Sequence, residues 1–385
     1  MRIIHFTAGL SPVEGGVVAA VRMAMAQATA GLDVSLAATL ATGDDSPLIQ
    51  LLEGQGVKLL RLPPELRRRR ATGEALGQME AAIDAADAVQ VHGLYETLVM
   101  QVLDVAQSAG KISVLTPHGM LTPWSLKQKR LKKTVYLKAV AGRRLRRTTV
   151  LHFTTESEAR ASSPALPAGP RRVVIPLPLD FAAIDAAVSE PEPGPEPETA
   201  RGGGGEMVMG YVGRIVAGKG IRRLIEALAL MDDRGARVRL IGDDQTPFAR
   251  ACRDLAEQRG VGDRVEFAGR IAPPGLYTAL TELSPFVLPS AHENFGQSAV
   301  EAMACGVPTL VSEGVAIGGE AVAAGAAAWI SREPAELARQ LDGWSDARDK
   351  RSAMGRAAWT WTRQQFAMEP NGRRWADTLA AELRP

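Results

Sequence analysis

The sequence is poor in the residues that build disulfide or metal frameworks. Its 385 residues include two cysteines, Cys252 and Cys305, and five histidines. Two cysteines without paired spacing exclude a disulfide framework and a cysteine zinc site, and they suit a reducing cytoplasm. His5, His92 and His152 stand in or beside strand-like runs, so we expect them in the core or lining a cleft. No Asp-x-Asp triple occurs, and we predict no metal site.

Long apolar runs and a strong net charge are also missing. No run approaches the roughly 18 apolar residues of a membrane span, and the opening MRIIHFTAG predicts a strand better than a signal peptide. The net charge is only +2, which argues against nucleic acid as a partner. A hydrophobic share of 46% and a charged share of 23% predict a soluble globular protein with two or three domains.

Strand-like and helix-like patterns alternate along the chain. Runs such as RIIHFTAG and AVQVHGLY are separated by helix-length apolar patterns, for example at 17–31 and 96–109. This alternation predicts βαβ units with parallel sheets. The stretch 190–206 has too much Pro, Gly and Glu to bury a core, and it predicts a flexible boundary. A second series of strands and helices begins directly after it with EMVMGYVGR.

The predicted fold is therefore α/β, with two Rossmann-like doubly wound domains that face each other across a cleft. Ligands of such sheets bind at the carboxyl ends of the strands. The predicted segments are an N-terminal domain at 1–185, a linker at 186–206, a C-terminal domain at 207–365 and a C-terminal helix at 366–385. The final segment is expected to be helical, with a break near Pro370.

Two glycines follow the first predicted strand. Gly15 and Gly16 open a helix, so free N–H groups and the positive end of the helix dipole would suit an anion. The spacing is not G-x-G-x-x-G, and a nicotinamide cofactor is not indicated. The alternative is a plain turn between a strand and a helix.

The stretch GYVGRIVAGKGI combines a strand end, a glycine-rich loop and a helix start. It contains Gly213, Arg214 and Lys219, and it nearly spells a phosphate-binding loop. Gly220 takes the place of the hydroxyl residue that would hold magnesium. An arginine and a lysine at a helix start fit a diphosphate that is neutralised by side chains. The alternatives are a nucleotide hydrolase of the P-loop type and two surface cations beside a turn.

The stretch SAHENFGQSAVEAMACGVP contains two glutamates eight positions apart. Glu293 lies in a predicted loop, and Glu301 lies on the helix that follows. One carboxylate could accept hydrogen bonds from hexose hydroxyls and the other from ribose hydroxyls, with a diphosphate near the N–H groups around Phe295 and Gly296. The alternative is an ordinary pair of exposed acids on an amphipathic helix.

The combination of these motifs resembles a known family. The E-x7-E pattern after LPS, the GR…KG turn, the early GG loop and TPHGMLTPW are similar to those of retaining glycosyltransferases of the GT-B fold, family 4. The resemblance covers nearly the whole chain. It implies transfer of a hexose from a UDP- or GDP-sugar to a hydroxyl acceptor, with no cofactor and no metal. It also implies acceptor binding by the first domain, donor binding by the second, and a C-terminal helix that crosses back onto the first.

The resemblance implies a role for each motif residue. Arg214 and Lys219 would grip the donor diphosphate, Glu301 would hold the ribose, and Glu293 would hold the hexose. His118, whose alternative is a core histidine at a strand end, would sit beside the anomeric carbon. The implied catalytic residues are His118, Arg214, Lys219 and Glu293. The implied donor-binding residues are Gly15, Gly16, Gly213, Arg214, Lys219, Glu293, Asn294, Phe295, Gly296 and Glu301.

Two stretches depart from the family pattern. LIGDDQ has Asp244 where a glycine is common, at a place that bears on contact with the nucleotide base. PLPLD at 176–180 replaces the PNGVD that is frequent near the hinge. Neither departure removes a phosphate or sugar contact.

The segment 127–147 has ten Lys or Arg residues and no acid. It is predicted to be helical, with Leu131, Val135 and Leu145 among its apolar positions. A basic amphipathic helix favours an anionic membrane surface, and the sparse aromatics argue against nucleic acid. We therefore expect a cytoplasmic protein, peripheral on the inner membrane face, with a lipid-linked glycan acceptor in polysaccharide or lipopolysaccharide assembly. The alternatives are a solvated helix face and a membrane-binding module without catalysis.

Overall fold

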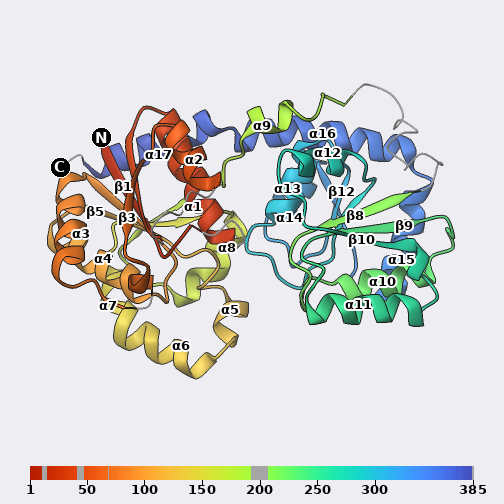
Figure 1. The fold of residues 1–385 in the computed structure, drawn as a ribbon, viewed down its shortest axis with the longest axis horizontal. Helices are drawn as coiled ribbons and strands as arrows, with labels where there is room; N and C mark the ends of the chain where they lie inside the picture. The colour runs from red at the N-terminus through yellow and green to blue at the C-terminus, as the bar shows by residue number, and fades with distance from the viewer. Residues whose placement is uncertain (11–14, 41–46, 68, 192–206, 384–385) are drawn as a thin grey trace. The chain divides into compact units, whose positions relative to one another are not determined.

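The chain divides into two compact α/β units (Figure 1). Unit 1 comprises Met1–Leu179 and Phe366–Pro385, and unit 2 comprises Asp180–Gln365. The structure is a computed structural model. It describes residues 1–10, 15–40, 47–67, 69–191 and 207–383.

Unit 1 is built on a seven-stranded parallel sheet with the order β3-β2-β1-β4-β5-β6-β7. Its strands are β1 (Arg2–Thr7), β2 (Asp33–Thr39), β3 (Lys58–Leu62), β4 (Ala88–His92), β5 (Ile112–Thr116), β6 (Val150–Phe153) and β7 (Arg171–Val174). The central strands β4, β5 and β6 are buried along their whole length. Helices cover both faces of such a sheet, so the polar residues of these strands, Gln90, His92, Ser113, Thr116 and His152, are buried with the apolar ones.

The helices of unit 1 lie mostly between successive strands. They are α1 (Gly15–Thr29), α2 (Pro47–Gly54), η1 (Pro64–Arg67), α3 (Gly73–Ala85), α4 (Thr97–Ser108), α5 (Pro123–Lys127), α6 (Arg130–Tyr136), the π-helical η2 (Leu137–Ala141), α7 (Gly142–Arg147), α8 (Glu156–Ser162), η3 (Ser163–Ala165) and α17 (Met368–Glu382). One core cluster joins the sheet to α3, α4 and α7, with Met79, Leu98 and Leu145 among its members.

Unit 2 repeats the plan with a six-stranded parallel sheet of order β10-β9-β8-β11-β12-β13. Its strands are β8 (Val208–Val212), β9 (Arg237–Ile241), β10 (Val265–Gly269), β11 (Phe286–Leu288), β12 (Thr309–Val311) and β13 (Ala327–Trp329). Its helices are α9 (Phe181–Asp185), α10 (Ile221–Leu230), α11 (Pro247–Gln258), η5 (Gly262–Arg264), α12 (Gly275–Thr281), α13 (Gln297–Ala304), α14 (Gly318–Ala323), α15 (Pro334–Ser345) and α16 (Arg348–Phe366).

The order of the strands defines one special place in each sheet. The first strand of each unit lies between its second and its fourth strand, so the order reverses between β1 and β4 and again between β8 and β11. The loops after these strands diverge to opposite faces, and ligands of open α/β sheets bind there. The predicted doubly wound parallel sheets are confirmed, and each predicted strand run contains a strand.

The last helix belongs to unit 1. α17 packs along α1, and an added Cβ on Gly372 would lie 1.9 Å from the carbonyl oxygen of Ala26. The helical segment breaks at Ala367, earlier than the predicted break near Pro370. Proline is tolerated in the first turn of a helix because its missing N–H would have no intrahelical partner there.

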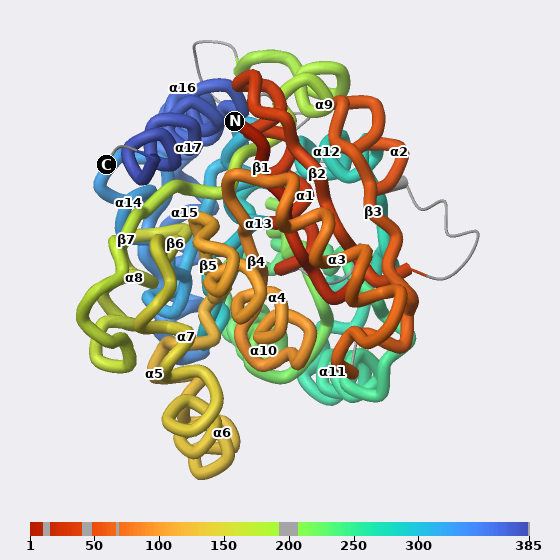
Figure 2. Tube along the Cα trace, turned by 90° about the vertical axis from the view of Figure 1, so that its left-hand side faces the viewer, coloured from red at the N-terminus to blue at the C-terminus, as the bar shows by residue number. Residues whose placement is uncertain are grey.

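Helices α5, α6, η2 and α7 form a lobe, here called the basic lobe, residues 123–147. Figures 1 and 2 both show α6 standing away from the sheet of unit 1. The predicted helix over 127–147 is interrupted once, because Lys129 between α5 and α6 has a left-handed backbone with φ 54°.

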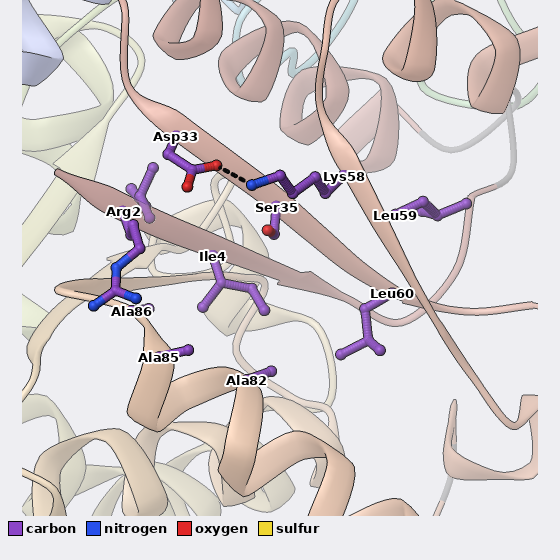
Figure 3. A pocket seen from close by; sticks show the side chains of 11 residues that line it. Arg2, Ile4, Asp33, Ser35, Lys58, Leu59, Leu60, Ala82, Ala85 and Ala86 are labelled. Carbon is purple, nitrogen blue, oxygen red and sulfur yellow. Dashed lines mark hydrogen bonds and ion pairs between the residues drawn. The ribbon is translucent and has the colours of Figure 1, made fainter.

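A hollow of about 380 Å³ lies at the amino ends of β1, β2 and β3 (Figure 3). Arg2, Asp33 and Lys58, the first residues of these strands, line it, and Lys58 forms an ion pair of 2.7 Å with Asp33. Ligands of doubly wound sheets bind at the opposite, carboxyl edge. The candidate sites described below are at that carboxyl edge.

Candidate functional site

The site in unit 2 is formed by the loops that follow the neighbouring strands β8 and β11. Helix α10 begins after the first loop and helix α13 after the second. The N-cap residues Gly220 and Gly296 have positive φ values of 79° and 101°. Free N–H groups in the first turn of both helices therefore lie at the carboxyl edge of one sheet, where an anion is favoured.

The two loops pack backbone against backbone. The amide of Ala291 donates to the carbonyl oxygen of Gly218 at 2.7 Å. An added Cβ on Gly220 would lie 2.1 Å from the carbonyl oxygen of Pro289, which no side chain can do without displacing the loop. The hydroxyl residue of a P-loop therefore has no room at position 220. This finding argues against the predicted alternative of a magnesium-dependent nucleotide hydrolase.

Lys219 and Glu293, 74 positions apart, meet between these loops. The Lys219 ammonium lies 2.5 Å from Oε1 of Glu293, and the hydroxyl of Ser290 donates to the same oxygen at 3.0 Å. The two charged side chains are only 17% and 18% exposed. The backbone of Glu293 is held by its own hydrogen bond to the carbonyl of Gly314 at 2.8 Å. The pair is thus fixed in place before any ligand binds.

The charges of this pair affect neighbouring ionisable groups. Burial raises the pKa of Tyr211, the nearby Glu293 raises it further, and Arg214 opposes the shift. Burial lowers the pKa of His292, while Glu293 opposes that shift. Tyr211 therefore stays protonated, and its hydroxyl donates to the carbonyl oxygen of Arg214 at 3.0 Å.

Gly213 and Arg214 lie directly after β8. Gly213 has φ 148°, and its amide donates to the carbonyl of Ile241 on the neighbouring strand β9 at 3.0 Å. Arg214 is exposed. An added Cβ on Gly242 would lie 2.0 Å from the carbonyl oxygen of Gly213, so the loops after β8 and β9 are in contact as well.

The start of α13 carries buried polar atoms that lack a hydrogen bond among the described residues. They are Oδ1 of Asn294 and Nε2 of Gln297. A buried polar group without a partner costs about 1–3 kcal/mol, and a polar ligand at the start of α13 would satisfy both atoms. Phe295 between them is buried, whereas Glu301 further along α13 is partly exposed. Sequence reasoning missed Gln297, although its place directly after Gly296 was a signal.

Asp244, the departure in LIGDDQ, has local partners. Its carboxylate forms an ion pair with Arg253, and the side-chain amide of Gln245 donates to it at 2.9 Å. Arg253 lies on α11 and also stacks on the ring of Phe267, 4.3 Å from the ring centre. The acid at this position is therefore neutralised inside unit 2.

In unit 1 the structure brings Gly16 beside His118. An added Cβ on Gly16 would lie 3.6 Å from Cδ2 of the His118 ring, at the first turn of α1. His118 has a left-handed backbone with φ 47°, a conformation that is costly for a residue other than glycine and concentrates at functional sites. The next amide, of Gly119, donates to Oε1 of the buried Glu158 at 2.6 Å. Sequence reasoning missed Glu158, which gave no pattern signal.

His118 is the outermost of three stacked histidine rings. Its Nε2 lies 3.1 Å from Nδ1 of His92, and Nε2 of His92 lies 2.9 Å from Nδ1 of His5. Burial lowers the pKa of His118 and of His5 to about 4, and that of His152 to about 3. Burial and the neighbouring rings also hold the pKa of His92 well below its usual value. All four rings are therefore neutral near pH 7.

The basic lobe exposes apolar side chains among its cations. Leu131 and Val135, one turn apart on α6, are 79% and 56% exposed, and Trp124 on α5 is 49% exposed. Leu145 on α7 is buried and fixes the lobe to the core cluster of unit 1. Among the described residues, no helix is both long and apolar enough to cross a bilayer.

Two family models match this chain. A model of the glycosyl transferase 4-like domain matches residues 14–178, and a model of glycosyl transferases group 1 matches residues 200–361. The two matches fall on the two α/β units and together span most of the sequence. The chain therefore belongs to the GT-B glycosyltransferases of the family 4 type.

Curated relatives match parts of the chain. It is 35% identical to 2-deoxystreptamine N-acetyl-D-glucosaminyltransferase of Streptomyces fradiae over 156 residues, which are 37% of this chain and 36% of that protein. It is 29% identical to GDP-mannose-dependent alpha-(1-6)-phosphatidylinositol dimannoside mannosyltransferase of Mycobacterium tuberculosis over 168 residues, which are 42% of this chain and 43% of the relative. The chain thus matches less than half of the length of either relative.

Solved structures share the fold over the whole chain. HepE of Anabaena, solved in complex with UDP and glucose, matches with a TM-score of 0.75 and 18% identity over 99% of this chain and 100% of its own. WaaG, a glycosyltransferase involved in lipopolysaccharide biosynthesis, matches with a TM-score of 0.69 and 16% identity over 98% of this chain and 99% of its own. Identities this low show the fold alone, and the predicted GT-B fold is confirmed.

Serine at position 220 is expected to damage the site without creating a magnesium-dependent hydrolase. Gly220→Ser and the control Gly218→Ser both place a side chain on a left-handed backbone, with φ 79° and 91°. Only position 220 also meets the carbonyl oxygen of Pro289. We expect the control to lose about 1 kcal/mol of stability and Gly220→Ser to lose about 1–3 kcal/mol more, as measured by urea unfolding. Equal losses, or ATP hydrolysis gained by Gly220→Ser, would contradict this account.

The free energy of unfolding is expected to fall as the pH is lowered from about 6.5 towards about 4. The folded pKa values of His5, His92, His118 and His152 lie below the unfolded value, so the unfolded chain binds protons that the folded chain excludes. Their contribution is complete above the unfolded pKa and is lost as the pH falls through this window.

Urea unfolding at a series of pH values measures that slope. The variant His118→Asn serves as the comparison, since asparagine tolerates the left-handed backbone at this position. It is expected to show a shallower slope, by about one proton. A slope identical to that of the unchanged protein would mean that His118 does not resist protonation.

Proposed function

We propose that this protein is a retaining glycosyltransferase that moves a hexose from a nucleotide diphosphate sugar to a hydroxyl acceptor. The observation that carries the proposal is the paired Lys219 and Glu293, fixed between the two loops at the switch point of the second sheet. A cation, a carboxylate and two helix N-termini at one place match the groups of a sugar nucleotide, which offers phosphates and hydroxyls together.

The donor is expected to be a UDP- or GDP-sugar. HepE, which shares the fold, was solved with UDP and with UDP-glucose, and the mycobacterial relative is named for its dependence on GDP-mannose. In this assignment Glu293, Asn294, Phe295 and Gly296 hold the hexose side of the donor, and Glu301 holds the ribose. The polar atoms of Asn294 and Gln297 that lack a partner in the described part of the chain support donor contacts at the start of α13.

The chemical step needs stabilisation of a leaving diphosphate. Negative charge develops on it as the glycosidic bond breaks, and we expect Arg214, Lys219 and the first turns of α10 and α13 to interact with that charge in the transition state. We expect the departing phosphate oxygen to accept the proton of the acceptor hydroxyl on the same face of the sugar, which retains the configuration. His118 would contact the transferred sugar. The side-chain cations take the place of a divalent metal in this proposal.

Lys219→Ala and Glu301→Ala are each expected to lower turnover about tenfold or more. Lys219 would stabilise the charge of the leaving diphosphate, and Glu301 would position the donor through its ribose. The measurement is transfer or donor hydrolysis with UDP- and GDP-sugars, repeated in EDTA, where turnover should persist. Lys58→Ala is the matched control, since it breaks an exposed Lys–Asp pair at the amino edge of unit 1. Near-normal turnover of both site variants would end the donor assignment.

We further propose that the acceptor is lipid-linked and that the basic lobe binds the inner face of the cytoplasmic membrane. Leu131 is exposed between Arg130 and Lys132, and Val135, one turn further along α6, is exposed as well. Apolar groups on a basic helix suit the boundary of an anionic bilayer. The polysaccharide or lipopolysaccharide setting is supported by the fold shared with WaaG and by the mycobacterial relative, whose named acceptor is a phosphatidylinositol dimannoside.

Reversing two charges, Lys129→Glu with Lys132→Glu, is expected to weaken binding to vesicles rich in phosphatidylglycerol by about tenfold or more, because each cation near the surface contributes ~1 kcal/mol. Co-sedimentation at low salt measures the effect. Arg250→Glu with Arg259→Glu reverses the same charge on exposed residues of unit 2 and should bind like the unchanged protein. Equal loss in both pairs, or no vesicle binding by the unchanged protein, would favour a soluble acceptor.

A further inference from the structure

An unbroken series of hydrogen bonds leads from the partly buried His118 through the sheet of unit 1 to a backbone carbonyl. Its atom pairs are His118 Nε2–His92 Nδ1 at 3.1 Å, His92 Nε2–His5 Nδ1 at 2.9 Å, His5 Nε2–Gln27 Oε1 at 2.7 Å, Gln27 Nε2–Gln90 Oε1 at 3.1 Å, Gln90 Nε2–Thr116 Oγ1 at 3.0 Å, Thr116 Oγ1–His152 Nδ1 at 3.1 Å and His152 Nε2–Ile175 O at 2.8 Å. We call it the histidine chain. Every side chain in it except His118 is buried.

The last member decides which way every hydrogen bond points. The carbonyl oxygen of Ile175 can only accept, so Nε2 of His152 carries the proton and donates. In a neutral imidazole the other nitrogen then accepts, and Nδ1 of His152 takes the hydroxyl proton of Thr116. That hydroxyl has one proton, so its oxygen must accept from the amide nitrogen of Gln90.

The same elimination continues outward to the surface of the sheet. Oε1 of Gln90 accepts from Nε2 of Gln27, and Oε1 of Gln27 accepts from Nε2 of His5. Nδ1 of His5 therefore accepts from Nε2 of His92. Nδ1 of His92 in turn accepts from Nε2 of His118. One arrangement of protons satisfies all seven bonds when the rings are neutral.

We propose that the histidine chain holds His118 as a neutral imidazole with its proton on Nε2 and a lone pair on Nδ1, and that Gln27 is the positioning residue that sets this tautomer. The reactive consequence is that Nδ1 of His118 accepts a hydrogen bond from a hydroxyl. This role rests on the proposed function only for the identity of that hydroxyl, which belongs to the sugar or to the acceptor.

Burial supports the neutral state that the chain requires. It lowers the pKa of His5 and His118 to about 4 and that of His152 to about 3. The backbone of His118 is held independently, through the bond from Gly119 to Glu158. The ring and the backbone of His118 are thus fixed by separate contacts, as a preorganised site needs.

Gln27 is the member at which the chain can be reversed. If Gln27→Leu removes the acceptor, the proton of His5 Nε2 has no partner, and His5 is better satisfied with its proton on Nδ1. That proton is donated to His92 Nε2, His92 then donates from Nδ1 to His118 Nε2, and His118 must carry its own proton on Nδ1. Gln27→Leu is therefore expected to exchange the donor and acceptor nitrogens of His118.

The experiment is two-bond ¹H–¹⁵N spectroscopy of the full-length protein labelled with ¹⁵N-histidine, with the His118 signals assigned by their loss in His118→Asn. We expect the Nε2–H pattern for His118 in the unchanged protein near pH 7 and the Nδ1–H pattern in Gln27→Leu. In Gln27→Glu burial favours the neutral carboxylic acid, whose hydroxyl can donate to Oε1 of Gln90 while its carbonyl oxygen accepts from His5. This variant should therefore keep the Nε2–H pattern. An Nδ1–H or charged His118 in the unchanged protein overturns the proposal, even if Gln27→Leu and Gln27→Glu do not fold.

Kinetics provide a second readout. If Gln27 had only a structural role, Gln27→Leu would not lower kcat selectively. Gln27→Leu should lower kcat about tenfold or more while KM for the donor stays within about twofold. Gln101→Leu is the matched control, because Gln101 is a buried glutamine that, among the described residues, bonds only the backbone of Ala71. It should change neither the tautomer nor kcat. Equal kcat losses in the two variants overturn the catalytic consequence.

The spectra and the kinetics separate two kinds of failure. If the tautomer reverses in Gln27→Leu but no sugar transfer is found with any nucleotide sugar, the proposed function fails and the tautomer assignment stands. If transfer occurs and the tautomer of His118 does not respond to Gln27→Leu, the proposed function stands and the role of Gln27 is wrong.

Discussion

Contact between loop backbones at the carboxyl edge of the second sheet determines where the ion pair of the candidate donor site, Lys219 and Glu293, lies. The loops after β8, β9 and β11 approach so closely that Gly220 and Gly242 have no space for a Cβ. Lys219 and Ser290 are carried on these loops, and both contact Glu293. The charges are therefore positioned by the shape of the backbone, which is set when the sheet forms.

The two units differ in the charge of the side chains at the switch points of their sheets. In unit 2 the switch point carries an ion pair and two helix N-termini, which suit the phosphates of a donor. In unit 1 the switch point carries neutral histidines, because burial costs a charged imidazole more than a neutral one. A neutral ring with a fixed lone pair suits hydroxyl groups. This difference is consistent with the proposed roles, in which unit 2 binds the donor phosphates and His118 contacts a hydroxyl group.

The sequence motifs predicted local structure correctly where that structure depends on residues close together in the chain. The strand runs, the glycines at helix starts and the position of Glu301 on α13 all follow from short-range patterns. The helix break before α17 lies at Ala367, earlier than the break predicted near Pro370. The prediction was late because proline is accepted within the first turn of a helix. The loop GRIVAGKG resembles a P-loop in sequence, but the carbonyl of Pro289, nearly 70 positions away, lies against Gly220 and leaves no room for a hydroxyl side chain there.

By itself the sequence determined the doubly wound fold, the family resemblance and the residue types of the candidate donor site, because periodicity and spacing along the chain encode strands, helices and loops. Only the tertiary structure decided that Lys219 pairs with Glu293 and that four histidines, two glutamines and a threonine form one directed series of hydrogen bonds. Those contacts join residues from different strands and helices, and their distances depend on sheet order and packing that no local pattern records.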